Sequence, residues 1–197
     1  MGHYFDDDPT VASDRQEVEW SLPDGTLRLV TDTGVFGHGR ADVGTKLLLL
    51  KAPPPPDGGN LLDLGCGTGV IALTMARRAP AATVWAVDVN SRARQLTAEN
   101  AERNGIVNVR VGFPDEVPAN IAFDAIWSNP PIRIGKPALH ELLLRWLPRL
   151  TPDSAAHLVV QKHLGADSLQ HWLNENGLRA DRAAIGGGFR VLAVTAA

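Results

Sequence analysis

The stretch "SNPP", residues 128–131, combines residue types that could hold an amine during a reaction. The side-chain oxygen of Asn129 and the main-chain carbonyl of Pro130 are both hydrogen-bond acceptors. Proline has a fixed φ and lacks the N–H that a sheet needs. The two prolines should therefore end the apolar strand expected over 123–128 and keep that carbonyl in one direction. In isolation the motif is better explained as a simple strand terminator, and only its place beside the glycine-rich stretch favours the chemical interpretation.

A glycine-rich stretch, "DLGCGTG" from Asp63 to Gly69, lies where an apolar strand meets the following helix. Glycines at positions 65, 67 and 69 allow the backbone to turn sharply and to approach a ligand closely. A dinucleotide fingerprint would need glycine or alanine at Val70, and the lysine of a phosphate-binding loop is missing. The acidic start of the stretch, Asp63, suits instead a ligand that carries an ammonium group.

A second carboxylate, Asp88 in "VDVN", follows the next strand, nineteen residues after Gly69. At this place in an open α/β sheet, a carboxylate can accept hydrogen bonds from both hydroxyls of a ribose. Val89 would then lie beside the adenine. The alternative is an aspartate that only caps the helix expected from Ser91, and the order and spacing of the motifs favour ribose binding.

Short apolar strands alternate with amphipathic helices from Asn60 onward, which predicts a doubly wound α/β domain with a mostly parallel sheet. Only a glycine-rich turn separates the last two strands, within residues 178–195, so the last strand should be antiparallel. Earlier in the chain, "QEVEWSL" and "LRLVTD" flank the turn "PDGT" and predict a β-hairpin. We therefore divide the chain into an N-terminal β-hairpin extension, residues 1–40, and a main domain, residues 41–197.

Composition limits the classes of function without naming one. The chain has 197 residues, a formal net charge of −3 and one cysteine, so we expect no internal disulfide and a cytoplasmic location. No stretch approaches the roughly 18 apolar residues of a membrane span, and the acidic start has no signal-peptide core. The histidines show no ligand spacing, so we expect no metal site. The net charge neither indicates nor excludes a nucleic-acid substrate.

Taken in order, "DLGCGTG", "VDVN" and "NPP" resemble the motifs of class I S-adenosyl-L-methionine-dependent methyltransferases. The segment "GVFGHGRADVGTKLLL", residues 34–49, narrows the resemblance to the "methyltransferase small" group, which includes the small-subunit ribosomal RNA guanine-N2 methyltransferases. The resemblance covers about residues 34–197. It implies a Rossmann-like seven-stranded sheet and S-adenosyl-L-methionine as cofactor. The implied reaction is methyl transfer to an exocyclic amine, chiefly guanine N2 in ribosomal RNA or the small ribosomal subunit.

The resemblance also assigns roles to residues. Asn129 and Pro130 would orient the amine, and Pro131 and Ile132 complete the catalytic motif. Ile132 departs from the family, whose usual residue at this place is aromatic and stacks on the target base. Cys66 is better interpreted as a small packing residue than as a nucleophile. The expected cofactor contacts are Asp63, Gly65, Cys66, Gly67, Gly69, Asp88, Val89, Phe113 and Asn129.

Three cations are expected to bind the substrate near the active-site mouth. Arg133 and Lys136 lie on the loop that leaves "NPP", and Arg40 lies in the segment that the family folds over the same mouth. Phosphate contacts of this kind position a nucleic acid without reading its sequence. Alternatives stay open: N-methylation of a protein glutamine or of another base amine, or a module that binds the cofactor without catalysis.

Overall fold

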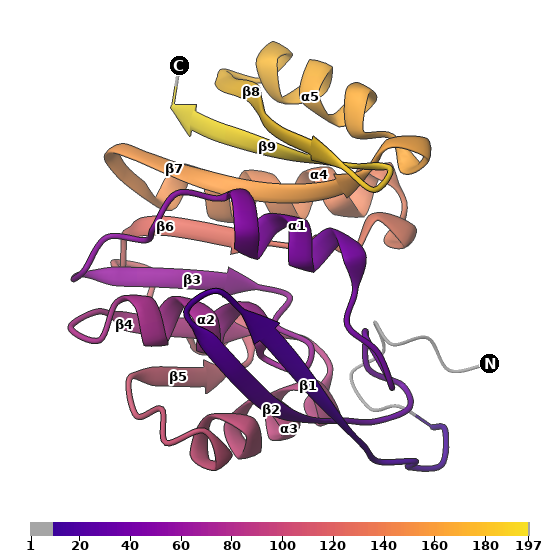
Figure 1. The fold of residues 1–197 in the computed structure, drawn as a ribbon. Helices are drawn as coiled ribbons and strands as arrows, with labels where there is room; N and C mark the ends of the chain where they lie inside the picture. Colours follow the sequence, from indigo (N-terminus) through magenta and orange to yellow (C-terminus); the bar gives the residue numbers. More distant parts are fainter. Residues whose placement is uncertain (1–9, 197) are drawn as a thin grey trace.

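The structure is a computed structural model that describes residues 10–196, and it contains two β-sheets (Figure 1). The smaller sheet is an antiparallel hairpin of β1 (Gln16–Leu22) and β2 (Gly25–Thr31). The larger sheet contains β3 (Asn60–Leu64), β4 (Thr83–Val87), β5 (Val109–Gly112), β6 (Phe123–Ser128), β7 (Leu150–Gln161), β8 (Leu178–Gly186) and β9 (Phe189–Ala196). The α-helices are α1 (Val43–Lys51), α2 (Val70–Arg78), α3 (Ser91–Arg103), α4 (Lys136–Trp146) and α5 (Ala166–Glu175).

The strand order in the large sheet is β5-β4-β3-β6-β7-β9-β8. The pairs among the first five strands are parallel, whereas β9 is antiparallel to both β7 and β8. The order reverses beside β3, because the chain runs outward to β5 and then returns to place β6 on the other side of β3. Ligands of open α/β sheets bind at such a switch point, beyond the carboxyl ends of the strands. The predicted seven-stranded sheet with an antiparallel last strand and an N-terminal hairpin is confirmed.

Helices cover both faces of the large sheet (Figure 1). Successive side chains of a strand point to opposite faces, so Leu61 and Leu62 of β3 enter different hydrophobic clusters. One cluster joins the sheet to α1, α2, α3 and the hairpin, and it includes Trp127. The other joins the sheet to α4 and α5, and it includes Trp146. No helix within residues 10–196 is long and apolar enough to cross a membrane.

Two side-chain amides, one in α3 and one at its C-terminal cap, fasten the hairpin to the main domain. Asn100 accepts a hydrogen bond from the N–H of Val30 at 2.7 Å and donates to the carbonyl of Val30 at 2.9 Å. One turn later, Asn104 makes the same pair of bonds with Arg28, at 3.0 and 2.8 Å. The two amides thus act as a pairing partner for β2. The described part of the extension shares its core with the main domain, and the boundary at residue 40 stays a prediction.

Candidate active site

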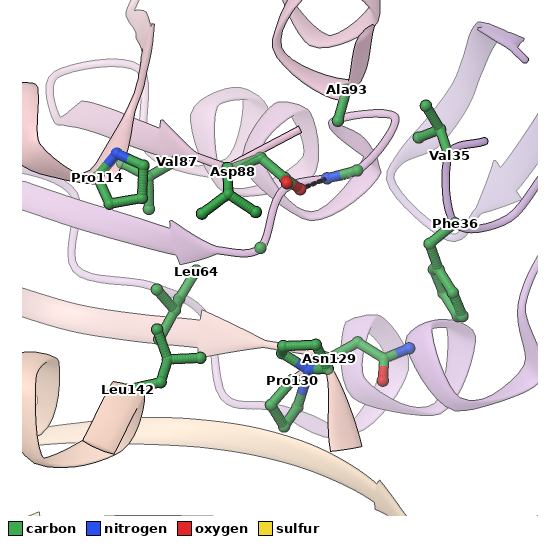
Figure 2. A pocket seen from close by; sticks show the side chains of 14 residues that line it. Val35, Phe36, Leu64, Val87, Asp88, Ala93, Pro114, Asn129, Pro130 and Leu142 are labelled. Atoms are coloured by element: carbon green, nitrogen blue, oxygen red, sulfur yellow. Dashed lines mark hydrogen bonds between the residues drawn. The ribbon is translucent and has the colours of Figure 1, made fainter. Parts of the chain in front are cut away.

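Three strands end on one side of the large sheet and bring the predicted motifs together. The glycine-rich stretch follows β3, Asp88 follows β4 and Asn129 follows β6, and parallel pairing places these strand ends side by side. They line a pocket with an empty volume of about 710 Å³, and Figure 2 shows Asp88 and Asn129 on opposite walls. The apolar residues that line it include Val35, Phe36, Leu64, Val87, Ala93, Pro114, Pro130 and Leu142.

All three glycines of the stretch have backbone conformations that other residues rarely adopt. Gly65 has a φ of 78°, Gly67 a φ of 54° and Gly69 a φ of 86°, all in the left-handed region. A Cβ atom at position 69 would lie 2.9 Å from side-chain atoms of Leu73 and Thr97, whereas one at position 65 would meet nothing within 4 Å. Close packing around α2 therefore requires Gly69, and the backbone direction at the pocket wall requires Gly65.

The N–H groups of the glycine-rich stretch are bonded within the protein. Those of Gly65 and Cys66 donate to the carbonyl of Val87, at 2.9 and 3.0 Å. That of Gly67 donates to the carboxylate of Asp88 at 3.0 Å. A pyrophosphate site needs free N–H groups that point at the ligand. This bonding pattern therefore does not suit a dinucleotide or a nucleoside triphosphate.

Asp88 is held as a hydrogen-bond acceptor at the pocket wall. One oxygen accepts the N–H of Gly67, and the other accepts the N–H of Asn90 at 2.9 Å. Burial raises the pKa of Asp88, although these main-chain donors oppose the shift. A carboxylate oxygen can accept two hydrogen bonds, so each retains capacity for a ligand hydroxyl. Val89, which is 39% exposed, lines the same pocket.

Asp63 lies behind the glycine-rich stretch and is fully buried. One of its oxygens accepts the N–H of Ala72 in α2 at 2.9 Å, and the other has no hydrogen-bond partner within the described residues. Burial, with the nearby charge of Asp88, raises the pKa of Asp63 to about 8. The side chain is not among those that line the pocket, and with a pKa of about 8 its carboxyl is mostly protonated at neutral pH.

Cys66 packs inside the hydrophobic cluster that includes α2. Its sulfur accepts a hydrogen bond from the hydroxyl of Thr97 at 3.3 Å, and burial raises the pKa of the Cys66 thiol well above its usual value. A thiol in this state is a poor nucleophile. Within residues 10–196, no group of three or more His, Cys, Asp or Glu side chains could hold a metal ion.

The amide orientation of Asn129 is set by two residues at the start of α1. Its Nδ2 donates to Oδ1 of Asp42 and to the hydroxyl of Thr45, both at 3.0 Å. Asp42 also caps α1, because the same Oδ1 accepts the N–H of Thr45 at 2.7 Å. A carboxylate can only accept, so Nδ2 must face Asp42 and the oxygen of Asn129 is left as the acceptor for the pocket.

The main-chain carbonyl of Pro130 is also held in one direction. Pro131 has φ −74° and ψ 70°, the geometry of an inverse γ-turn, and the N–H of Ile132 donates to the Pro130 carbonyl at 2.8 Å. A carbonyl oxygen has a second lone pair and can accept one further hydrogen bond. The "NPP" motif therefore presents two acceptors whose directions are fixed by other bonds.

A second pocket adjoins the first and has an empty volume of about 1290 Å³. Asn129 and Pro130 line both pockets and so form the boundary between them. Phe36 and Phe189 line the second pocket together with Ile132, so other segments supply the aromatic faces that position 132 lacks. The polar residues that line it are His38, Arg40, Asp42, Arg133 and Gln161.

Five residues predicted to contact ligands lie outside the linings of both pockets: Asp63, Cys66, Gly69, Phe113 and Lys136. Phe113 is covered by the guanidinium of Arg94, 5.4 Å from the ring centroid, and Pro114 lines the first pocket in its place. Lys136 begins α4 and donates to the hydroxyl of Ser168 in α5 at 3.1 Å. The other two predicted cations do line the second pocket.

The sequence prediction named Arg40 in the N-terminal segment but missed four other site residues that this segment and the start of α1 contribute. Val35 and Phe36 wall the first pocket, and Asp42 and Thr45 orient Asn129. A signal was present, because an aspartate three residues before a threonine at the start of an apolar helix is a capping pattern. That pattern predicts the cap but not the second contact that the capping carboxylate makes.

Comparison with known proteins places the chain in a family. A family model described as "Methyltransferase small domain" matches residues 26–193. "Uncharacterized protein YbxB" of Bacillus subtilis (strain 168) is 35% identical over 177 residues, which cover 88% of this chain and 88% of that protein. "Ribosomal RNA small subunit methyltransferase C" of Pseudomonas aeruginosa (strain LESB58) is 34% identical over 174 residues, which cover 80% of this chain and 52% of that protein. The match thus spans about half the length of the latter relative.

Solved structures have the same fold. The T. thermophilus 16S rRNA N2 G1207 methyltransferase (RsmC) in complex with AdoMet and guanosine matches with a TM-score of 0.76 and 21% identity, over 96% of this chain and 52% of that chain. A ribosomal protein L11 methylase from Lactobacillus delbrueckii subsp. bulgaricus matches with a TM-score of 0.62 and 22% identity, over 79% of this chain and 80% of that chain. From the extent of the family match and this fold, the chain belongs to the methyltransferase small domain family, whose methyl donor is S-adenosyl-L-methionine.

Proposed function

We propose that this methyltransferase transfers a methyl group to the N2 amine of a guanine in small-subunit ribosomal RNA. One observation carries the proposal: Asn129 presents a fixed amide oxygen, next to the Pro130 carbonyl, at the boundary between the two pockets. Relatives named "Ribosomal RNA small subunit methyltransferase C" support the choice of substrate.

The cofactor supplies a methyl group on a positively charged sulfur, which is already a strong electrophile. The main task of the protein is then to position the nucleophile. An exocyclic amine is a weak nucleophile because its lone pair is conjugated with the ring. Asn129 Oδ1 and the Pro130 carbonyl would each accept one N–H of this amine, which turns the nitrogen lone pair toward the methyl group. Both acceptors are held before the substrate arrives, so little reorganisation is needed.

The first pocket has the chemistry that this cofactor needs. Asp88 retains acceptor capacity for the two ribose hydroxyls, and Val89 and Pro114 offer apolar surface to the adenine. Asp63 has an oxygen without a partner among the described residues, and an ammonium or sulfonium group bound nearby would favour its ionised form and lower its pKa. Phe36 closes the pocket from the N-terminal segment (Figure 2).

The second pocket has the chemistry of a nucleotide site. Phe36 and Phe189 offer ring faces on which a base can stack, and Ile132 adds an aliphatic contact. Arg40 and Arg133 line the same pocket and could bind phosphates. A local pair of cations is compatible with the net charge of −3 of the whole chain. A ribosomal substrate would place the enzyme in the cytoplasm.

Methyl transfer from tritiated S-adenosyl-L-methionine tests the proposal. The acceptors are small ribosomal subunits, ribosomal RNA and total protein from cells that lack this enzyme. We expect label in RNA, and N2-methylguanosine after digestion to nucleosides. Label confined to protein glutamine or to another base amine would contradict the proposal in favour of the corresponding alternative. Cofactor binding without label in any fraction would favour a module without catalysis.

A further inference from the structure

We infer that Asp42 selects the target base by accepting a ring N–H that lies next to the target amine. The inference deepens the proposed function and rests on it. The Asp42 carboxylate lines the second pocket beside Asn129. It comes from the N-terminal end of α1 and not from the "NPP" motif, so it adds a separate point of contact.

The atom next to the amine differs among the candidate substrates. In guanine, the ring nitrogen N1 next to the N2 amine carries a hydrogen. In adenine and cytosine, the ring nitrogen next to the amine carries a lone pair, and in a glutamine side chain the neighbour is a carbonyl oxygen. An ionised carboxylate accepts from the first and repels the other three. Asp42 therefore favours guanine over every alternative that "NPP" alone would allow.

The two oxygens of Asp42 are used differently. Oδ1 accepts both the N–H of Thr45, at 2.7 Å, and Nδ2 of Asn129, at 3.0 Å. Oδ2 accepts no hydrogen bond from the described part of the chain. The first oxygen thus anchors the carboxylate, and the second is available to a ligand in the same pocket.

The anchored unit matches the guanine edge. Asp42 and Asn129 are joined by a 3.0 Å hydrogen bond and both line the second pocket, so each of these adjacent side chains supplies an oxygen acceptor there. Guanine presents N1–H and N2–H as neighbouring donors on one edge. A site built around such bonds discriminates strongly against analogues that lack one of the donors.

The substitution Asp42→Asn isolates the second oxygen. Asparagine caps helices about as well as aspartate, so its Oδ1 can keep the bonds from Thr45 and Asn129. Its Nδ2 replaces Oδ2 and turns that acceptor into a donor. Thermal unfolding measures whether the cap is retained. Asp57→Asn is the matched control. It makes the same charge change at an exposed residue of the loop before β3, at the end of that strand away from the active site.

Calorimetry on protein saturated with S-adenosylhomocysteine compares guanosine with 2-aminopurine riboside, which keeps the 2-amine but has a lone pair at N1. We expect the wild-type protein to bind guanosine more tightly by roughly tenfold to a hundredfold. In Asp42→Asn the ratio should fall by about tenfold or more, whereas Asp57→Asn should keep it. 2-Aminopurine riboside also lacks the O6 atom of guanosine. This loss should affect wild-type and variant proteins alike, so the change in the affinity ratio between them reports the N1 contact.

A wild-type ratio near one, or an unchanged ratio in Asp42→Asn, overturns the inference and leaves the proposed function standing. The proposed guanine site fails separately if the wild-type protein binds adenosine as tightly as guanosine. It also fails if neither nucleoside binds at millimolar concentration, and the inference then fails with it.

Discussion

The two sides of the active site differ in how their polar groups are held. On the cofactor side, three N–H groups of the glycine-rich stretch donate to oxygens at the end of the adjacent strand β4. On the substrate side, Asn129 is held by Asp42, a residue 87 positions away in the chain. The first set of bonds follows from the pairing of β3 with β4, whereas the second depends on where the N-terminal end of α1 lies.

The largest expected effect comes from removing the fixed acceptor on the substrate side. Asn129→Ala should lower turnover by roughly a hundredfold or more, as for other preorganised groups, and leave cofactor affinity nearly unchanged. Single-turnover methyl transfer and calorimetry with the cofactor measure the two quantities. Asn176→Ala, at the C-terminal end of α5, is the control and should keep both. Turnover equal to wild type in Asn129→Ala would remove the amine-positioning role from this residue.

On the cofactor side, a substitution should lower cofactor affinity more than turnover. Asp88→Ala removes a charged acceptor and should weaken cofactor binding by roughly 1.5–3 kcal/mol, about tenfold to a hundredfold. Turnover at saturating cofactor should change less than in Asn129→Ala. Titration calorimetry on the folded variant measures the affinity. A dissociation constant unchanged from wild type would exclude Asp88 from the cofactor site.

A smaller effect on RNA binding should distinguish the cations that line the second pocket from the one that does not. Arg40 and Arg133 line the second pocket, whereas Lys136 bonds to Ser168. Arg40→Ala/Arg133→Ala should weaken RNA binding and reduce the salt dependence by about one to two units of slope. Lys136→Ala is the matched control and should leave the slope close to wild type. Equal slopes in all three proteins would show that the pocket arginines do not contact phosphate.

The last prediction concerns the stability of the protein and the buried carboxyl of Asp63. The pKa of Asp63 is about 8 in the folded protein and 3.8 in the unfolded chain, so the folded state binds more protons between these values. The free energy of unfolding should therefore fall as pH rises from about 4 to 8, by at most about 1.4 kcal/mol per pH unit. Asp63→Asn removes this titration and should flatten the profile.

Denaturant unfolding at several pH values measures this profile, with Asp57→Asn as a control for an exposed carboxylate. The control should keep the slope of the wild-type protein. A slope in Asp63→Asn as steep as in wild type would mean that other groups, such as Asp88, whose pKa is also raised by burial, account for the pH dependence.

The fold and the cofactor side could be predicted from the sequence because their signals are local. Strand and helix periods identify the sheet, and the residues from Asp63 to Gly69 are consecutive. The substrate side could not be predicted in the same way. The sequence shows that Ile132 is not aromatic, but it does not show that Phe189 of β9, near the far end of the chain, lines the same pocket.

The direction in which individual side chains point could not be predicted from the sequence. β5 ends at Gly112 and a short 3-10 helix begins at Pro114, so one residue decides which side chain meets the pocket and which meets Arg94. Lys136 is close in sequence to Arg133, yet α4 begins there and carries its side chain toward α5. Sequence proximity predicts neither direction, because a turn between two neighbours can send their side chains opposite ways.

Asn100 and Asn104, which pair with β2, limit where the chains of two homologues can be joined in a chimera. A chimera that joins the hairpin of one homologue to the sheet of another would have to carry positions 100 and 104 with the hairpin. Leucine at either position would leave main-chain groups of Arg28 or Val30 without these partners. The hairpin and α3 would therefore have to come from the same homologue. A chimera joined at β3, which lies between them in the chain, would separate them.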